Sequence, residues 1–399
     1  MSKLNDLIKE LCPDGVEYKP LDSFATIVRG NGLQKKDFTE DGVGCIHYGQ
    51  IYTYYGTYAY ETKSKVSVEL AETLKKVETG DLVVAVTSEN IEDVCKCVAW
   101  LGEETIVTGG HAAIIKHKQN SKYLAYYFQT EDFYKQKVKI VTGTKVMDIA
   151  PSKMGKIIIP IPPLPVQCEI VRILDNFTAL TSALTSALTA ELTAQRKRYS
   201  GLLNSLLSFE GRDAQDGVLW KKLGDIAVNL DSRRIAVTKH NRKAGIYPYY
   251  GASGIVDYVD DYIFDGDFLL VSEDGANLVA RSTPIAFSIT GKNWVNNHAH
   301  VLKFDNIYLQ KYVEIYLNLL DLSPYISKGA QPKLSQTSLK KIILPIPDDS
   351  RIRYVVDILD RFDKLCNDLS EGLPAEIAAR QKQYEYYRDK LLTFKEKKA

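Results

Sequence analysis

The chain contains an internal duplication, which limits its possible folds more than any other feature of the sequence. Residues 121–209 recur at 306–394 with an offset of 185, apart from a one-residue slip in one loop. For example, Ile-Ile-Pro-Ile-Pro at 158–162 matches Ile-Leu-Pro-Ile-Pro at 343–347. Farther upstream the match is thinner and the second copy is shorter. We therefore expect two copies of one structural plan.

Each copy begins with a β-rich part. Short apolar runs, such as the one after Asp81 and the one after Asp267, are bounded by Gly, Asn and Asp, which is typical of strands. A short helix should follow in each copy, with Ser121 and Asn306 as its N-caps. The pattern then predicts a long helix of about 40 residues, or roughly 60 Å, in each copy. Pro374 is expected to kink the second long helix.

These patterns give the domain organisation and an α+β fold class. Residues 1–163 and 211–347 are predicted to be two globular domains, each β-rich with mixed α/β structure. Residues 164–210 are predicted to form a central helix and 348–399 a distal helix.

The central helix contains a four-residue repeat at 178–193. It reads Thr-Ala-Leu-Thr, Ser-Ala-Leu-Thr, Ser-Ala-Leu-Thr and Ala-Glu-Leu-Thr. The repeat begins at Thr178, and its leucines are Leu180, Leu184, Leu188 and Leu192. Four residues turn about 400°, so the leucine stripe drifts by roughly 40° per unit and does not fit a heptad seam. The repeat is therefore expected to set length rather than packing.

The apolar segments and the cysteines indicate a cytoplasmic protein without a membrane span. The most apolar stretches are interrupted by prolines and fall short of the roughly 20 residues that cross a bilayer. The first residues lack the apolar core of a secretory signal. The six cysteines form no zinc-type spacing, and buried free thiols are expected. They are Cys12, Cys45, Cys95, Cys97, Cys168 and Cys366.

Catalytic motifs are missing, with one formal exception. There is no phosphate-binding loop, no amino-methyltransferase signature and no HExxH. Asp14, Glu17 and Lys19 read literally as the metal-binding set of many nucleases, so a nuclease stays an alternative. Two residues between the carboxylates leave no room for the strand pair that makes them converge, and Asp-Gly is an ordinary turn signal.

Two histidines raise the question of a metal site. His298 and His300 form an HxH pair, which on a strand would place both rings on one face. No third ligand is spaced nearby. Because His298 aligns with His111 of the first copy, a shared structural or polar-contact role is favoured over a metal site.

Charge is segregated along the chain despite a formal net charge of +1. Residues 221–243 carry seven basic residues against two acidic ones, whereas residues 257–274 carry seven acids and no base. A basic patch is thus offset by an acidic one.

The remaining polar loops have the side chains that contact DNA. Arg and Lys bind phosphates, and Asn, Gln, Arg and Lys reach base edges. In the first domain the candidates are Asn31, Gln34, Lys35, Lys36, Tyr48, Gln50, Tyr52, Ser88, Asn90, Thr144 and Lys145. In the second they are Arg233, Arg234, Lys239, Asn241, Arg242, Lys243, Tyr249, Tyr250, Asn277, Arg281, Asn297, Lys328, Gln331 and Lys333. The alternative is that these loops are merely solvated and that the tyrosines fill sheet cores.

Over nearly its whole length the chain resembles the specificity subunit of type I restriction–modification systems. The most specific similarity lies at residues 170–181, 249–262 and 376–394. The resemblance implies two target recognition domains joined by two long helices that pack as an antiparallel coiled coil. Each domain would read one half of a bipartite, asymmetric DNA target. An antiparallel pairing of duplicated helices would also give a pseudo-two-fold arrangement that suits duplex DNA.

The resemblance further implies partners that perform the chemistry. Two methyltransferase subunits would dock on the helices and domains and modify adenine, while separate restriction subunits would cut. Those partners would use S-adenosylmethionine, ATP and Mg²⁺, and this chain would hold no cofactor, no metal and no catalytic residue. The helices would set the spacer between the half-sites. Competing hypotheses are a stand-alone nuclease or methyltransferase and a purely structural scaffold.

Overall fold

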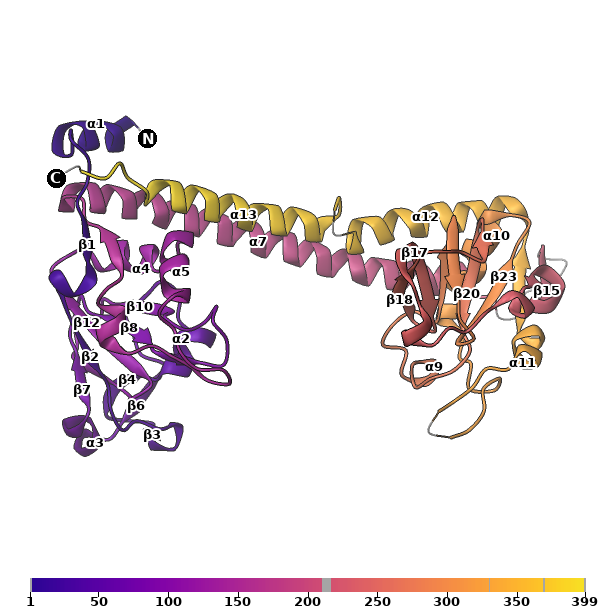
Figure 1. Ribbon diagram of the computed structural model, residues 1–399, viewed down its shortest axis with the longest axis horizontal. Helices are drawn as coiled ribbons and strands as arrows, with labels where there is room; N and C mark the ends of the chain where they lie inside the picture. Colours follow the sequence, from indigo (N-terminus) through magenta and orange to yellow (C-terminus); the bar gives the residue numbers. More distant parts are fainter. Residues whose placement is uncertain (1, 210–216, 330, 369, 398–399) are drawn as a thin grey trace. The chain divides into compact units, whose positions relative to one another are not determined.

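The computed structural model describes residues 2–209, 217–329, 331–368 and 370–397 (Figure 1). Its contacts divide the chain into two units. Unit 1 comprises residues 1–188 and 376–399, and unit 2 comprises residues 189–375. The predicted boundary at residue 210 and the first residues of 211–347 lie outside the described residues.

Unit 1 contains many short elements before the first long helix (Figure 1). In chain order they are α1 (Ser2–Leu11), β1 (Tyr18–Pro20), η1 (Leu21–Ser23), β2 (Ala25–Arg29), η2 (Lys35–Asp37), β3 (Phe38–Thr39), β4 (Val43–Ile46), α2 (Tyr48–Thr53), β5 (Tyr58–Ala59), β6 (Ser64–Val66), α3 (Val68–Thr73), β7 (Lys75–Val77), β8 (Leu82–Ala85), β9 (Thr87–Ser88), β10 (Cys97–Trp100), β11 (Ile106–Thr108), β12 (Ala112–His117), α4 (Ser121–Tyr127), α5 (Glu131–Val138), β13 (Met147–Asp148), α6 (Pro151–Met154) and β14 (Ile158–Pro160). The prediction of a β-rich domain is confirmed.

The core of unit 1 lies on both faces of one five-stranded sheet, ordered β2-β12-β8-β10-β5. On one face, Val84 belongs to the cluster that contains Leu124 of α4. On the other face, Val83 and Ile114 pack with Ile46 of the second sheet, ordered β3-β6-β4-β11-β7. A strand covered on both faces needs apolar residues at every position, which explains the uninterrupted apolar run after Asp81.

Unit 2 repeats this plan with fewer strands. Its elements are β15 (Val218–Lys222), α8 (Leu223–Ile226), β16 (Val228–Asn229), η4 (Asp231–Arg233), η5 (Lys239–Asn241), β17 (Ala244–Gly251), β18 (Gly254–Val259), β19 (Phe264–Asp265), β20 (Phe268–Ser272), α9 (Asn277–Ala280), β21 (Ala286–Ile289), β22 (Lys292–Val295), β23 (Ala299–Lys303), α10 (Ile307–Leu319), α11 (Gln336–Lys341) and β24 (Ile343–Pro347). Two four-stranded sheets, β16-β23-β20-β21 and β18-β17-β22-β19, share the core. Leu269 and Leu270 of β20 face opposite clusters, as Val83 and Val84 do in unit 1.

The short helix that follows the sheet differs slightly from the prediction. In unit 1 the N-cap is Asn120, whose side chain accepts from Tyr123 N, and Ser121 is the first helical residue. In unit 2 Asn306 caps α10 as predicted. The Asn120 side chain takes the cap by accepting this bond, so α4 begins one residue earlier than predicted. The buried Tyr123 hydroxyl donates to the carbonyl oxygen of Pro160 at 2.8 Å.

The first long helix is α7 (Leu164–Leu207), as predicted, and the boundary between the units falls within it. The second is not one kinked helix. It forms α12 (Asp349–Asn367) and α13 (Leu373–Leu391), with the break before Pro374 rather than at it. Asp368 ends α12 because its carboxylate accepts hydrogen bonds from the backbone N–H groups of Ser370 and Glu371. Pro374 then occupies the first turn of α13, where a proline is tolerated.

Within each unit, α7 packs antiparallel against a distal helix. In unit 1, Phe177 contacts the ring of Tyr387, and Thr178 Oγ1 lies 2.9 Å from Tyr384 Oη. In unit 2, the Tyr199 ring contacts Phe362 and Arg196 donates to the Cys366 carbonyl oxygen. In both units residue numbers rise along α7 as they fall along its partner, which is the antiparallel order.

Five of the six cysteines are buried free thiols, and the expectation fails only for Cys168, which is exposed on α7. Burial raises the pKa of the Cys45 and Cys95 thiols to about 12. In the part of the chain that the structure describes, no helix has the length and apolar character needed to span a membrane.

Candidate nucleic-acid interface

In unit 1, a small hairpin joins the end of the central strand β8. The chain passes from β8 into β9, where Thr87 and Ser88 pair with Asp148 and Met147 of β13. Thr142 and Asp148 exchange backbone hydrogen bonds of 3.0 and 2.8 Å, which closes the loop between them. The tip of this hairpin, residues 143–146, is exposed.

Arg29 ties this hairpin to two other segments at the same edge of the sheet. It stands at the end of β2, where it pairs with Ala113 of β12. Its guanidinium donates to Asp148 Oδ2 at 2.6 Å and to the Gly110 carbonyl oxygen at 3.1 Å. We call this region the loop end of unit 1: Arg29 and residues 86–88, 109–111 and 142–148.

Unit 2 has a loop end built in the same register. Ser272 of β20 pairs with Ala299 of β23, as Ala85 pairs with Ala112 in unit 1. The two central strands therefore correspond with an offset of 187. Ser327 N donates to the Lys333 carbonyl oxygen at 2.9 Å, which matches the Thr142–Asp148 closure. The loop end of unit 2 comprises residues 231–234, 273–274, 296–298, 327–329 and 331–333.

Arg234 binds the loop end of unit 2 at the position equivalent to the one that Arg29 binds in unit 1. Its Nη1 donates to the Asn297 carbonyl oxygen at 3.4 Å, and Asn297 corresponds to Gly110. It also donates to the Ala299 carbonyl oxygen and to Glu273 Oε2, each at 2.7 Å. Only 12% of its side chain is exposed, whereas the exposed pair of Arg29 and Asp148 lies at the surface. Each loop end is thus held by one arginine bound to an equivalent carbonyl group.

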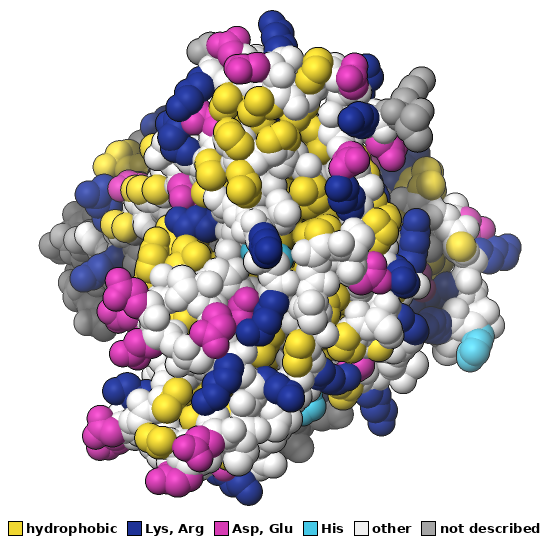
Figure 2. Space-filling view, turned by 90° about the vertical axis from the view of Figure 1, so that its left-hand side faces the viewer, with side chains coloured by type: hydrophobic (Ala, Val, Ile, Leu, Met, Phe, Trp, Pro, Cys, Tyr) yellow, Lys and Arg dark blue, Asp and Glu magenta, His cyan; other side chains and the backbone are white. Residues whose placement is uncertain are grey.

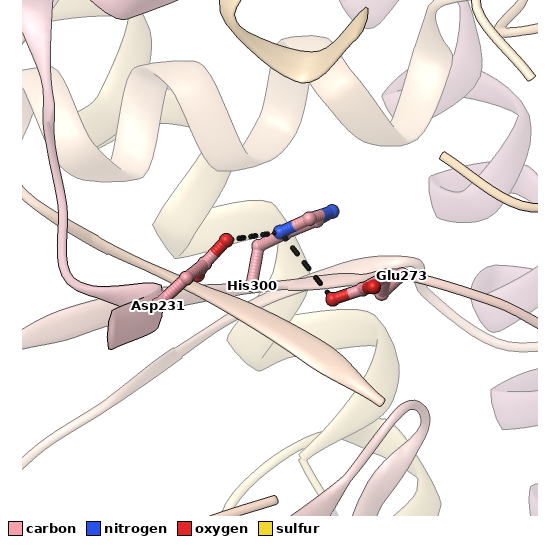
Figure 3. A group of neighbouring side chains, drawn as sticks. All are labelled: Asp231, Glu273 and His300. Atoms are coloured by element: carbon pink, nitrogen blue, oxygen red, sulfur yellow. Dashed lines mark hydrogen bonds and ion pairs between the residues drawn. The ribbon is translucent and has the colours of Figure 1, made fainter. Parts of the chain in front are cut away.

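A buried ion cluster lies beneath the loop end of unit 2 (Figure 3). His300 Nδ1 lies 2.6 Å from Asp231 Oδ2 and 3.7 Å from Glu273 Oε2. His300 Nε2 lies 2.8 Å from the Leu334 carbonyl oxygen. Every one of these partners is an acceptor, so each ring nitrogen faces a group to which it can donate. The cluster joins η4, the end of β20, β23 and the loop before α11.

Charge pairing in the cluster holds its acids ionised. Burial alone would raise the pKa of Asp231, but the hydrogen bond and charge of His300 outweigh it, and the pKa is lowered. For Glu273, burial is likewise outweighed by the hydrogen bonds from Arg234 and Lys333, so its pKa is also lowered. Both carboxylates stay charged because cations surround them.

His298 and His300 do not lie on one face, as the HxH pattern had suggested. The two rings do not share a site, since His298 is exposed beside Asp274 and His300 is buried against Asp231. Acidic neighbours of His300 do exist, but they come from residues distant in sequence. Among the described residues, Asp231, Glu273 and His300 form the one group placed to hold a metal ion. Arg234 Nη1 lies 2.7 Å from Glu273 Oε2, so a cationic side chain already pairs with this group.

His298 and His111 occupy equivalent positions, and their shared polar-contact role is confirmed. His298 Nδ1 lies 2.9 Å from an oxygen of Asp274. His111 Nδ1 lies 2.9 Å from Thr87 Oγ1. By the offset of the central strands, Asp274 corresponds to Thr87. Both rings are exposed at their loop ends.

Several of the unit 1 candidates are engaged within the domain. Gln50 is buried, and its amide donates to Ser64 Oγ at 2.6 Å. Ser88 is buried in β9, and the Tyr52 hydroxyl donates to the Thr87 carbonyl oxygen. Gln50 and Ser88 therefore shape the loops rather than face a ligand. The exposed candidates are Asn31, Gln34, Lys35, Lys36, Asn90, Thr144 and Lys145, while Tyr48 and Tyr52 are half-buried.

In unit 2 three of the candidate cations likewise bind groups within the domain. Arg234 belongs to the ion cluster. Arg242 pairs with Asp257 at 3.1 Å and lies over the ring of Tyr249, which is itself buried. Arg281 donates to two carbonyl oxygens at the C-terminal end of α10. These arginines stabilise the domain, and a phosphate contact would require breaking their present bonds.

The remaining unit 2 candidates are more accessible, with two exceptions. Asn277 folds its side chain back onto Thr283, and Tyr250 packs partly against Phe287. The exposed candidates are Arg233, Lys239, Asn241, Lys243, Asn297, Lys328, Gln331 and Lys333. Among these, Lys333 also pairs with Glu273 at 3.1 Å.

Sequence reasoning missed Arg29 and Asp148 of unit 1. Their pairing spans 119 positions and depends on the register of β2, β12 and β13. The alignment of the two copies points to this position, because Asp148 corresponds to the candidate Lys333. Thr87 and Asp274 were also missed as the anchors of the two histidines.

The nuclease alternative finds no support at Asp14 and Glu17. Asp14 lies in the exposed turn after α1, whereas the Glu17 carboxylate pairs with Lys19 at 2.5 Å. The hydrogen bond and charge of Lys19 lower the pKa of Glu17. Neither acid belongs to the one metal-type group found among the described residues.

On one face of the molecule, surface charge is mixed rather than concentrated. On the face shown in Figure 2, Lys and Arg side chains are interspersed with Asp and Glu, and no continuous basic stripe crosses it. A polyanion would therefore be bound at particular loops rather than by a broad field over this face.

The repeat in α7 behaves as its periodicity predicts. Leu180 and Leu184 are 67% and 38% exposed, so the leucine stripe has drifted away from the partner helix. From residue 178 to residue 199 the less exposed positions are Thr178, Thr181, Thr185, Leu188, Leu192, Gln195 and Tyr199. They alternate by four and three residues, which is heptad spacing. Threonines occupy the seam in the first half of the repeat, whereas the repeat leucines Leu188 and Leu192 occupy it in the second half.

Comparison with known proteins gives a family match to both copies. A family model described as the type I restriction modification DNA specificity domain matches residues 13–194 and 217–379. A putative type I restriction enzyme specificity subunit of Haemophilus influenzae is 36% identical over 183 residues, which are 45% of this chain and 47% of that protein. The EcoprrI specificity subunit of Escherichia coli is 32% identical over 297 residues, covering 68% of this chain and 71% of that protein. The match thus spans about half of the Haemophilus protein.

Solved structures share the fold. A chain from a structure on complex assembly and conformational transition of the type I restriction–modification system has a TM-score of 0.65 at 15% identity, covering 95% of this chain and 97% of that one. The HsdS subunit from Thermoanaerobacter tengcongensis has a TM-score of 0.57 at 15% identity, covering 96% and 97%. The predicted fold class is confirmed.

Proposed function

Since the chain belongs to the type I restriction modification DNA specificity family, we propose that it is the DNA-reading subunit of a type I restriction–modification complex. Each loop end contacts one half of a bipartite, asymmetric target. The chain itself has no catalytic role. Like the complex it serves, it works in the cytoplasm, where the DNA is.

One observation carries this proposal: the two loop ends share a framework but differ at their tips. The closing backbone bonds at Thr142 and Ser327 are equivalent. Between them, residues 143–146 read Gly-Thr-Lys-Val in unit 1, whereas the corresponding tip of unit 2 contains Lys328, Gly329 and Gln331. Base edges are distinguished by the donors and acceptors that approach them. Two tips of different chemistry on one framework fit two different half-sites.

Partners supply the chemistry in this proposal. Two methyltransferase subunits bind the helices and domains, and they hold S-adenosylmethionine and flip the target adenine. Restriction subunits join the complex and use ATP and Mg²⁺. Duplicated docking elements on one chain are consistent with two copies of the same partner.

The repeat of α7 sets the spacer length in this proposal. Removing residues 182–185 shortens the helix by about 6 Å, a little under two base-pair rises. We expect the spacer to shorten while both half-site sequences stay the same. Sequencing the methylated sites of a host that carries the shortened chain measures this. An unchanged spacer would rule out the repeat as a ruler.

The methylated sites of a host expressing the complete system test the main proposal. The unmodified chain should give one two-part motif. Exchanging residues 143–146 for those of another specificity subunit should alter one half of that motif and leave the other half unchanged. A change in both halves, or in neither, would contradict the assignment of one half-site to each loop end. The purified chain alone, with DNA, Mg²⁺ and a methyl donor, should neither cut nor methylate.

A further inference from the structure

We propose that His111 and His298 are equivalent phosphate contacts, one in each loop end, that bind DNA independently of base sequence. This inference rests on the proposed function, because it concerns how the same loop ends hold the duplex. It separates the residues that fix each domain on the DNA backbone from the tip residues that read bases.

The register of the sheets makes the two histidines equivalent. Ala112 pairs with Ala85, and Ala299 pairs with Ser272. His111 and His298 each immediately precede the first residue of these pairs, at the start of β12 and β23. A second bond is also shared: the carbonyl oxygens of both histidines accept from the backbone N–H groups of Val86 and Glu273, at 3.0 and 2.9 Å. The backbone holds both rings at one position of the framework.

Each ring is anchored through the same atom and leaves the other nitrogen open. Nδ1 of His298 faces Asp274, and Nδ1 of His111 faces Thr87. Within the described part of the chain, no hydrogen-bond partner approaches Nε2 of either exposed ring. Tyr48 supports the His111 ring, with centroids 4.9 Å apart. An oriented ring with one free nitrogen is a ready contact for a ligand outside the domain.

The carboxylate anchor fixes which ligand His298 can accept. Because Asp274 is an acceptor, Nδ1 must carry a proton. A bond from Nε2 to an oxygen acceptor then requires a second proton, and the ring becomes a cation. A phosphate oxygen favours that cation, since a charge-assisted bond is stronger than a neutral one.

The retention of histidine in both copies argues for the phosphate rather than a base. Around these positions the copies diverge: Gly110 corresponds to Asn297, and Thr87 to Asp274. Residues that read different half-sites should differ between the copies, as the tips do. Every half-site, by contrast, presents the same phosphate backbone, and phosphate contacts position a protein without reading sequence. An exposed residue that is kept while its surroundings change fits the feature that both half-sites share.

The test uses the full chain assembled with its methyltransferase subunits. Binding is measured for His298→Gln, His111→Gln and His298→Arg on two duplexes, one with the complete target and one with both half-sites scrambled. Each Gln variant should bind both duplexes about tenfold more weakly. The slope of log affinity against log salt should become shallower by about 0.9. His298→Arg should restore affinity and slope because it keeps a cation.

The matched control is His117→Gln, the same change at the opposite end of β12, where the side chain accepts a local backbone bond from Gln119. It should leave both affinities unchanged. A duplex with single methylphosphonate substitutions probes the unmodified complex without any variant. One neutralised phosphate in each half-site should cost the unmodified chain about tenfold in affinity and cost the matching Gln variant nothing further.

Two results would overturn the proposal. If a Gln variant loses affinity only for the complete target and keeps its salt slope, the histidine reads a base. If neither variant nor any methylphosphonate changes affinity, the rings do not contact DNA. Failure of the proposed function is distinguishable, because the unmodified complex would then bind the complete and scrambled duplexes equally.

Discussion

Replacing Arg234 with methionine should destabilise unit 2 much more than the same change at the adjacent Arg233. Arg234 is 12% exposed and donates to Glu273 and to the Ala299 carbonyl oxygen, each at 2.7 Å. Arg233 is exposed, donates to the carbonyl oxygen of Ile263, and lies 4.9 Å from the centroid of the Phe264 ring. Methionine keeps much of the apolar stem of each side chain, so the comparison isolates the charge.

The magnitude follows from what the substitution leaves behind. Without Arg234, the buried carboxylate of Glu273 retains Lys333, and that of Asp231 retains His300. Breaking a buried ion pair costs about 3 to 5 kcal/mol, and the surviving partners place this case near 3. The Arg233 change should cost under about 1 kcal/mol, as for other surface substitutions.

Hydrogen exchange on the full chain measures this, because peptides report each unit separately. Peptides covering η4 and β23 should exchange roughly a hundredfold faster in Arg234→Met, while those of unit 1 stay the same. Equal exchange in the Arg233 and Arg234 variants would refute the reasoning that the cluster stabilises unit 2. DNA affinity should respond in the opposite order, since Arg233 is the exposed member of the pair.

The pH dependence of stability provides a second readout for the same variant. The fold lowers the pKa of Asp231 and of Glu273, so their contribution is present above the unfolded pKa values and is lost as the pH falls. Stability of unit 2 should therefore decline between about pH 5 and pH 3, and Arg234→Met should decline less steeply over that range. An identical slope in both proteins would show that Arg234 does not lower the pKa of Glu273.

Three further outcomes are expected. Thr178→Val removes the bond to the Tyr384 hydroxyl and should lower the stability of unit 1 by about 1 kcal/mol. Thr193→Val, at an exposed position, should lower it by less. Chemical unfolding of the full chain measures both. Tyr123→Phe leaves the carbonyl oxygen of Pro160 without its buried donor and should lower stability by about 1 to 2 kcal/mol; no loss would mean that water replaces the hydroxyl. Lys145→Gln or Lys328→Gln should make the salt slope of DNA binding shallower by about 0.9 while the methylated motif stays the same, and a changed motif would assign that lysine to base reading.

The parts of the fold that depend on local pattern could be predicted from the sequence. The duplication and α7 follow from residue identity and from helical spacing. The break between α12 and α13 was placed at Pro374, but Asp368 ends the helix earlier through bonds to Ser370 and Glu371. A capping carboxylate competes with the helix over a few residues, and its effect depends on a local turn that residue type alone does not reveal.

The candidate interface was predictable in composition but not in geometry. Arg233 and Arg234 are neighbours of the same type in the basic segment, yet one is exposed and the other is buried against Glu273. That difference arises because η4 packs against β23 and Arg234 reaches Glu273 just after β20, both of which lie tens of residues away. Residue type indicates what a side chain can bind, whereas the strand register decides whether it is free to do so. Gln50 and Ser88 show the same limit, since both are polar and both are buried.

The threonine seam of α7 bears on how such a chain can change over generations. Thr178, Thr181 and Thr185 contribute little apolar area to the contact with the partner helix, so a gain or loss of one repeat disturbs few buried hydrophobic groups. Four inserted residues rotate the following helix by only about 40° beyond a full turn. Variants that differ by one repeat should consequently fold. A change in repeat number can thus give such a chain a new DNA target without any mutation in either loop end.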